Sequence, residues 1–204
     1  MGTPRRPNLV MNLSKKLVLG SQSPRRAQFL KDLELDFRTL PLDVDETAPS
    51  ELNAIETAIF VSELKANALL PLLAADELGI TSDTEVWLEN RRYGKASNYE
   101  EAFDMIQSLS GKTHVVVSGL SVIDPSANPA IQSTSSVVEV TFNHIPEWAI
   151  HHYINTYSPF DKAGAYGIQE WIGQGFISEI KGNYNSVVGL DTAALVSFLT
   201  PYIK

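Results

Sequence analysis

The chain has 204 residues, of which 44% are hydrophobic and 20% charged, a composition typical of a globular protein with one substantial core. Its 16 Lys and Arg residues against 24 Asp and Glu residues give a net charge of −8, which disfavours binding to long nucleic acid but still allows a local basic cluster for a small anion. The absence of cysteine excludes disulfides, thiolate chemistry and cysteine-based zinc sites.

The N-terminal segment lacks the pattern of a secretory signal, and no apolar run approaches the roughly 18 residues that a membrane helix needs. We therefore expect a cytoplasmic protein without membrane association. Residues 1–14 are predicted to form a disordered tail, with Met11 as a candidate start, ahead of a single domain at residues 15–204.

Hydrophobic periodicity and turn signals predict alternating strands and helices along the rest of the chain. Strands are predicted at residues 16–20, 37–40, 78–81, 86–88, 113–123, 133–142 and 176–180. Helices are predicted at residues 25–33, 54–73, 99–109, 146–157 and 192–200. This alternation favours an α/β fold, and the two successive long strands indicate a mixed sheet. We expect one domain with two lobes around a cleft.

Residues 21–26, between the first strand and the first helix, form a candidate phosphate-binding loop. Ser23 suits the N-cap, and unpaired N–H groups at a helix N-terminus favour an anion. The hydroxyls of Ser21 and Ser23 and the guanidinium groups of Arg25 and Arg26 add further donors. The alternative interpretation is an ordinary helix cap followed by two solvated arginines.

Two acidic positions are candidates for metal binding or proton transfer. Glu46 ends an acidic loop, residues 43–46, whose carboxylates suit a divalent cation, although a solvated turn is the alternative. Asp83 follows a predicted strand, at the sheet edge where α/β folds place their ligands. It is a candidate metal ligand or general base, or else a turn residue.

Three further segments carry polar residues that suit a nucleotide. Lys95 follows a turn and either offsets phosphate charge or is an ordinary surface lysine. Residues 161–169 contain Lys162 and Gln169 among small residues without strand or helix periodicity, and the amide of Gln169 suits the edge of a base. Residues 181–186 read as a second polar loop that lines the same cleft.

Taken together and in order, these segments resemble the Maf family of nucleotide pyrophosphatases from about Lys16 to the C-terminus. The segments that carry the resemblance are residues 21–26 (family pattern S-x-S-P-R-R), 43–46, 82–84 (G-A-D-T), 94–95 (G-K-P), 109–114, 161–169 and 187–190.

The chain departs from the family pattern at five positions without losing a candidate catalytic side chain. These are Thr81 and Ser82 in place of Gly and Ala, Ala96 and Asp191 in place of Pro, and Ser186 where Asn is common. If the family glycine needs a positive φ, the β-branched side chain at Thr81 is expected to strain that strand end.

The resemblance implies an elongated mixed α/β fold of two lobes around a central cleft, like that of Maf and inosine triphosphatase proteins, and it implies a possible homodimer. It also implies cleavage of a nucleoside triphosphate to the monophosphate and pyrophosphate, with Mg²⁺ or Mn²⁺ as cofactor. Arg25, Thr84 and Gln169 match the branch that acts on dTTP and UTP, whereas the branch for a methylated GTP has Trp, Gln and Glu there.

Carried over residue by residue, the resemblance implies a role for each member of the candidate site. The catalytic residues are Asp83, Glu46 and Lys95, of which Glu46 and Asp83 also bind the metal. The substrate-binding residues are Ser21, Ser23, Arg25, Arg26, Thr84, Lys162 and Gln169. Two other functions stay open: a nucleotide-binding regulator of cell division with little turnover, and a phosphatase that releases single phosphates.

Overall fold

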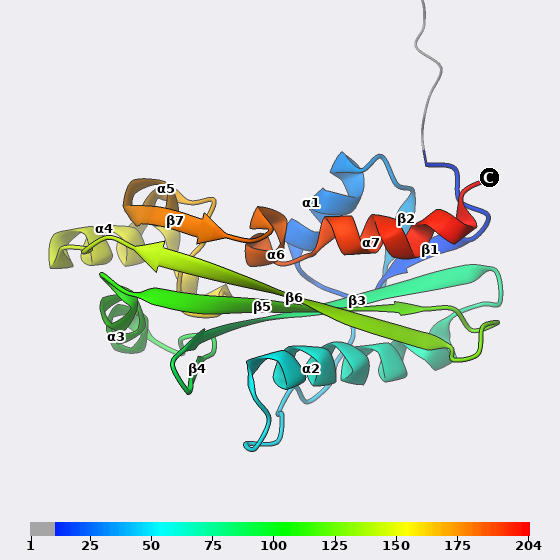
Figure 1. Ribbon diagram of the computed structural model, residues 1–204, viewed down its shortest axis with the longest axis horizontal. Coiled ribbons are helices and arrows are strands. Elements are labelled where there is room, and N and C mark those ends of the chain that lie inside the picture. Colours follow the sequence, from blue (N-terminus) through cyan, green and yellow to red (C-terminus); the bar gives the residue numbers. More distant parts are fainter. Residues whose placement is uncertain (1–10) are drawn as a thin grey trace, which may run out of the picture.

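The structure, a computed structural model, describes residues 11–204 and is built on one mixed, seven-stranded sheet (Figure 1). The strand order is β2-β1-β3-β5-β6-β7, with β4 paired to β3. The strands are β1 (Lys16–Leu19), β2 (Phe37–Thr39), β3 (Glu77–Leu88), β4 (Arg91–Tyr93), β5 (Thr113–Ile123), β6 (Ile131–Phe142) and β7 (Ile177–Lys181). β1 runs parallel to β2 and β3, and the other pairs are antiparallel, which confirms the predicted mixed α/β sheet.

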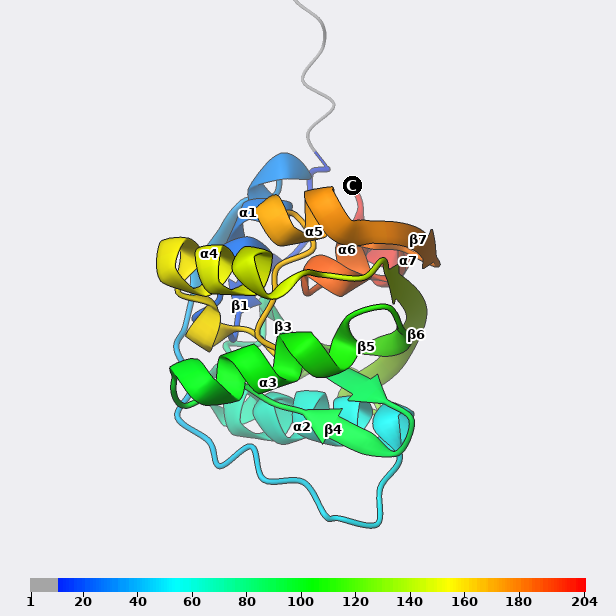
Figure 2. The ribbon, with the colours of Figure 1, turned by 90° about the vertical axis from the view of Figure 1, so that its left-hand side faces the viewer.

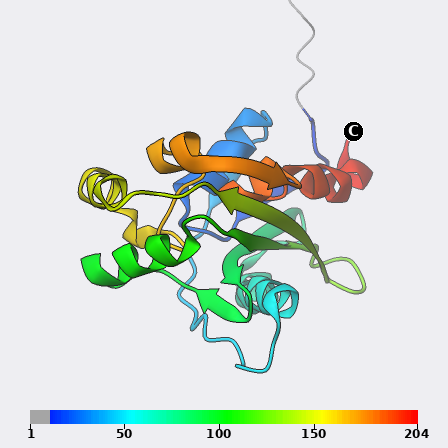
Figure 3. The ribbon, with the colours of Figure 1, turned by 60° about the vertical axis from the view of Figure 1, so that its left-hand side comes forward.

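Helices cover both faces of the sheet and one of its ends. They are α1 (Pro24–Asp32), α2 (Ala54–Leu69), α3 (Tyr99–Leu109), α4 (Glu147–Tyr157), α5 (Trp171–Phe176), α6 (Tyr184–Val188) and α7 (Thr192–Leu199). α2 lies on one face, α1 and α7 lie on the other, and α3, α4 and α5 gather at one end (Figure 1 and Figure 3). A long loop without regular structure links β2 to α2 (Figure 2).

Strand β3 runs through two separate parts of the hydrophobic core. Its first half contributes Leu78 and Ile80 to a cluster with α1 and α7, and its second half contributes Val86 and Leu88 to a cluster with α3 and α4. The four polar residues between them, residues 82–85, lie in the middle of the strand. The two clusters correspond to the two predicted lobes, and the polar segment of β3 lies between them.

β3 differs from the prediction of two short strands separated by a turn, so Asp83 lies within a strand rather than at its end. Residues 82–85 are polar, which is typical of a turn, but they pair with β5, where Asp83 faces Gly119 and Thr84 faces Ser118. The packing of α2 on β5 leaves no room for a side chain at Gly119, because a Cβ there would lie 2.1 Å from the carbonyl oxygen of Ala58 in α2. Long-range pairing therefore overrides the local turn signal.

Three smaller predictions were also wrong. Residues 91–93, which belong to the turn predicted before Lys95, form β4, because they pair with the end of β3 as a hairpin. The predicted loop at residues 181–186 contains the start of α6, which Asn183 caps by accepting a hydrogen bond from the backbone N–H of Asn185. The helix predicted at residues 54–73 ends at Leu69, since Pro71 cannot continue the helical hydrogen bonds.

Residues 11–14 are joined to the C-terminal end of the chain. Leu13 pairs with Ile203, and the backbone N–H of Ser14 donates to the carbonyl oxygen of Tyr202 at 2.7 Å. This differs from the prediction of a disordered tail that extends to residue 14, because the contacts come from the far end of the sequence. The remainder of that predicted tail, residues 1–10, lies outside the described residues.

His114 in β5 makes the fold sensitive to acid. The ring is 1% exposed, stacks on Phe142 and shares a 2.7 Å hydrogen bond with the Tyr166 hydroxyl, and burial lowers its pKa from 6.5 to about 4. Its contribution to stability is therefore fully present above about pH 6.5. As the pH falls from about 6.5 to about 4, the folded protein loses up to about 3 kcal/mol of stability, because the imidazole of the unfolded chain binds a proton while the buried ring of His114 stays neutral.

Urea unfolding between pH 7 and 4 is expected to show a shallower loss of stability for His114→Gln than for the unmodified protein. His144→Gln is a matched control, because His144 is exposed. The role assigned to His114 would be contradicted if His114→Gln kept the full acid sensitivity.

Candidate active site

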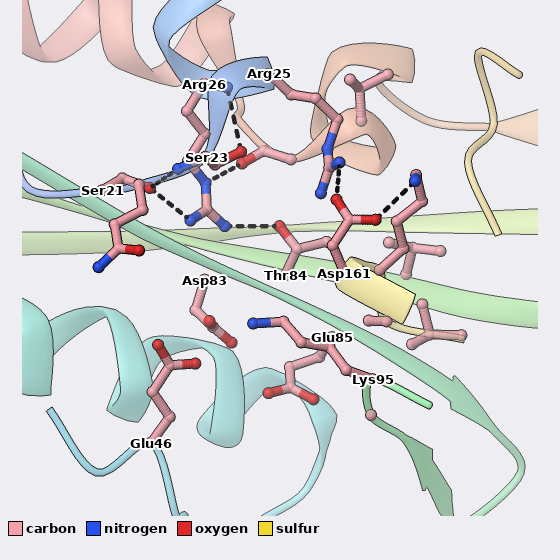
Figure 4. Close-up of a pocket in the computed structure, with 18 of the residues that line it drawn as sticks. Ser21, Ser23, Arg25, Arg26, Glu46, Asp83, Thr84, Glu85, Lys95 and Asp161 are labelled. Atoms are coloured by element: carbon pink, nitrogen blue, oxygen red, sulfur yellow. Dashed lines mark hydrogen bonds and ion pairs between the residues drawn. The ribbon is translucent and has the colours of Figure 1, made fainter. Parts of the chain in front are cut away.

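A cavity of about 540 Å³ lies beside the polar segment of β3. Every site residue predicted from the sequence lines it, although the residues come from five separate parts of the chain (Figure 4). These residues are Ser21, Ser23, Arg25, Arg26, Glu46, Asp83, Thr84, Lys95, Lys162 and Gln169. The fold therefore brings all ten together, while their individual roles stay predictions.

The predicted phosphate loop begins α1 as expected. Ser23 is the N-cap, with its side chain accepting from the backbone N–H of Arg26, and a proline occupies the first turn. The hydroxyl of Ser21 accepts a hydrogen bond from the backbone N–H of Ser23 at 3.2 Å. Ser23 thus caps α1, and the same residues also line the cavity, so the interpretation as a helix cap and the interpretation as an anion-binding loop do not exclude each other.

Arg26 is held in a single orientation by three acceptors. Its Nε donates to the carbonyl oxygen of Gly189 at 2.8 Å, Nη1 to the Ser21 hydroxyl at 3.2 Å and Nη2 to the Thr84 hydroxyl at 3.3 Å. Burial lowers the pKa of this guanidinium, but an arginine stays charged in proteins. The cavity therefore contains a fixed positive charge at the phosphate loop.

Lys65 on α2 joins the two predicted acidic residues. Its Nζ lies 2.8 Å from Oδ1 of Asp83 and 3.0 Å from Oε1 of Glu46. Burial favours the neutral form of Asp83, but the charges of Lys65 and Arg26 outweigh this effect and lower its pKa. Asp83 is thus an ionised carboxylate at neutral pH, which is the state that a general base needs.

The sequence interpretation missed Lys65, although a signal was present. Position 65 continues the buried stripe of α2 formed by Ala58, Val61 and Leu69. A lysine on the buried face of a helix requires a partner, because an unpaired buried charge is costly. This spacing was sufficient to single it out.

Glu85 and Arg92 form a second charged pair that the sequence interpretation missed. Glu85 lies two residues after Asp83, on the same face of β3, and accepts hydrogen bonds of 2.6 Å from both Nε and Nη2 of Arg92. Burial, together with the charge of Asp83, raises the pKa of Glu85 to about 7 despite this pairing. Arg92 belongs to the hairpin that was predicted as a turn, so no local signal pointed to it.

The opposite wall of the cavity is a chain of ion pairs around Asp161. The carboxylate contacts Nη1 of Arg25 and Nζ of Lys162, each at 2.8 Å, and Lys162 also lies 3.2 Å from Glu170. Burial opposes ionisation of Asp161, but hydrogen bonds from Lys162 and Arg25 lower its pKa to about 2. Lys95 pairs with Ala163 in an isolated bridge, which places it beside this wall.

Thr81 fits β3 without the strain expected from its replacement of a family glycine. It is fully buried, is absent from the residues with positive φ, and donates its hydroxyl to the carbonyl oxygen of Ser62 at 2.8 Å. The backbone there is an ordinary strand, which a β-branched residue favours. The expected strain is therefore not found.

The carboxylates of the cavity suit a cation that is shared with a substrate. Among residues 11–204, no group of three or more histidines or acidic residues is arranged to hold a metal by itself. Glu46 and Asp83 lie on either side of one ammonium group, and Mg²⁺ is commonly held by one or two carboxylates together with substrate phosphates. Hard oxygen ligands of this kind fit Mg²⁺ or Mn²⁺.

Comparison with known proteins gives consistent matches. The family described as "Maf-like protein" matches residues 16–202. A dTTP/UTP pyrophosphatase of Flavobacterium johnsoniae is 45% identical over 188 residues, which are 92% of this chain and 95% of that protein. A dTTP/UTP pyrophosphatase of Flavobacterium psychrophilum is 41% identical over 184 residues, or 90% of this chain and 93% of that protein.

Among solved structures, a HAM1 protein from Coxiella burnetii aligns with 65% of this chain and 75% of its own, with a TM-score of 0.44 and 17% identity. No helix in the described part of the chain is long and apolar enough to span a membrane.

Proposed function

The chain belongs to the Maf family, and from this premise we propose that it hydrolyses dTTP and UTP to the nucleoside monophosphate and pyrophosphate. The observation that carries the proposal is the composition of the cavity. It unites the cationic groups of Arg25, Arg26, Lys95 and Lys162 with the ionised carboxylate of Asp83. Cations suit a triphosphate, and a carboxylate among them suits a water that attacks it.

Asp83 is proposed to accept the proton of the attacking water. Lys65 and Arg26 keep this carboxylate ionised, and the 2.8 Å contact with Lys65 fixes its orientation. Arg26 and Lys95 stabilise the negative charge that develops on the phosphates, together with the N–H groups at the start of α1. A divalent cation held by Glu46, Asp83 and the phosphates would neutralise charge and lower the pKa of the water.

Arg25, Thr84 and Gln169 are proposed to select the base. All three line the cavity with the phosphate loop, so one bound nucleotide can reach both sets. Arg25 is paired with Asp161 at 2.8 Å, so a substrate has to compete with this carboxylate for the guanidinium. A cytoplasmic location and a homodimer stay part of the proposal.

The proposal is tested by measuring pyrophosphate release from a panel of nucleoside triphosphates, with and without Mg²⁺. We expect release from dTTP and UTP that depends on the cation. Binding without turnover would instead support a regulator of cell division, a function that the names of the relatives do not favour. Direct release of orthophosphate would support a phosphatase.

A further inference from the structure

A chain of hydrogen bonds runs from the phosphate loop through β3 and β5 to α6. Nη2 of Arg26 donates to Oγ1 of Thr84 at 3.3 Å, and this hydroxyl lies 2.9 Å from Oγ of Ser118. Oγ of Ser118 in turn donates to the carbonyl oxygen of Ser186 at 2.7 Å. Thr84 and Ser118 are direct cross-strand partners, so the pairing of β3 with β5 holds their hydroxyls together. Figure 4 shows the first step of this chain beside the cavity.

The direction of each hydrogen bond in the chain follows from chemistry. A carbonyl oxygen only accepts, so the single hydrogen of the Ser118 hydroxyl is committed to Ser186. The hydrogen between Thr84 and Ser118 must therefore come from Thr84. A guanidinium only donates, so Arg26 occupies one lone pair of the Thr84 oxygen. Thr84 is left with one lone pair and no hydrogen to offer to a ligand in the cavity.

This arrangement is protected from exchange with water. Ser118 and Ser186 are each 1% exposed, so solvent cannot take the place of either partner. In such surroundings a lost hydrogen bond is not replaced, and the orientation of the hydroxyls is well defined.

We propose that Ser118 is a positioning residue that holds the Thr84 hydroxyl as a pure acceptor, so that the cavity prefers bases with a ring N–H over cytosine. Uracil and thymine carry a hydrogen on N3, whereas the same nitrogen of cytosine is an acceptor. Two acceptors facing each other leave a desolvated polar group unpaired, which disfavours the wrong base. This inference rests on the proposed function, since it concerns the substrates of that activity.

Gln169, the other candidate for reading the base, cannot make this distinction by itself. Its side-chain amide carries both a donor and an acceptor, and rotation by half a turn exchanges them. Thr84 cannot adapt in this way as long as Ser118 takes its hydrogen. The choice between ring N–H and ring N is thus assigned to Thr84 and Ser118 together.

The test is the ratio of kcat/KM for dTTP to that for dCTP. In Ser118→Ala the Thr84 hydroxyl is free to donate, and we expect the ratio to fall by about tenfold or more. Ser118→Thr retains a hydroxyl and is expected to restore the ratio. Ser136→Ala is the matched control, because Ser136 faces Ser118 across β5 and β6, while its buried hydroxyl has no hydrogen-bond partner among residues 11–204.

A double-mutant cycle separates this role from a merely structural one. In the background of Thr84→Val, which has no hydroxyl to orient, Ser118→Ala is expected to leave the ratio unchanged. Melting temperatures of all variants show whether each of them is folded.

The inference would be overturned if Ser118→Ala kept the wild-type ratio, including the case in which it slows dTTP and dCTP hydrolysis by the same factor. Equal hydrolysis of the two nucleotides by the wild type would also overturn it, although the proposed function would stand. A wild type that releases no pyrophosphate from either would overturn both.

Discussion

Asp83→Asn is expected to lower kcat/KM for dTTP by about 10²- to 10⁴-fold, which is the typical contribution of a general base. Asparagine has nearly the same shape as aspartate, so it fills the same space, but its amide does not accept a proton from water. The loss is expected mainly in kcat, because the arginine and lysine side chains that bind phosphate are unchanged.

Pyrophosphate release from dTTP, measured over a range of substrate concentrations, gives kcat and KM separately for this variant. A melting curve is needed beside it, because Asp83→Asn removes the charge that pairs with the buried Lys65. The 3.0 Å contact of Lys65 with Glu46 remains and limits the loss of stability. The matched control is Asp76→Asn, a carboxylate just before β3 whose side chain is 62% exposed and paired with Lys16. Wild-type turnover by Asp83→Asn would refute its role as the base.

Arg26→Lys is expected to lower kcat/KM for dTTP by about 10²- to 10³-fold, even though it keeps the positive charge. The guanidinium reaches Gly189, Ser21 and Thr84 at once through three different nitrogen atoms. A lysine presents a single ammonium on a flexible stem and cannot reproduce this planar fork. The charge would therefore be less well placed for the phosphates, and the Thr84 hydroxyl would lose one of its partners.

The comparison of Arg26→Lys with Arg26→Met separates the charge from the geometry. We expect the methionine variant to be slower still, since it loses both. Arg91→Lys serves as control, because Arg91 is exposed, stacks over the ring of Tyr93 at 4.9 Å and does not line the cavity. If Arg26→Lys retained wild-type kcat/KM, a fixed guanidinium at the phosphate loop would not be required.

Elements whose signals are local were predicted closely from the sequence. The helix at residues 99–109 and the strand at residues 113–123 have the predicted bounds, because their apolar residues recur with the period of each element. The prediction failed for β3, where four polar residues interrupt the apolar pattern. Their place in a strand depends on β5, more than 30 residues further along the chain.

The sequence by itself identified ten residues of the candidate site, since all ten line one cavity. Each motif is short and has an ordinary alternative by itself, and it was the order of the motifs along the chain that identified them. Only the tertiary structure decided which charges meet: Lys65 between Glu46 and Asp83, Arg92 on Glu85, and Asp161 between Arg25 and Lys162. It also decided the direction of the hydrogen bonds at Thr84. Such partners are set by the pairing of distant strands and by burial, and neither is encoded in the order of neighbouring residues.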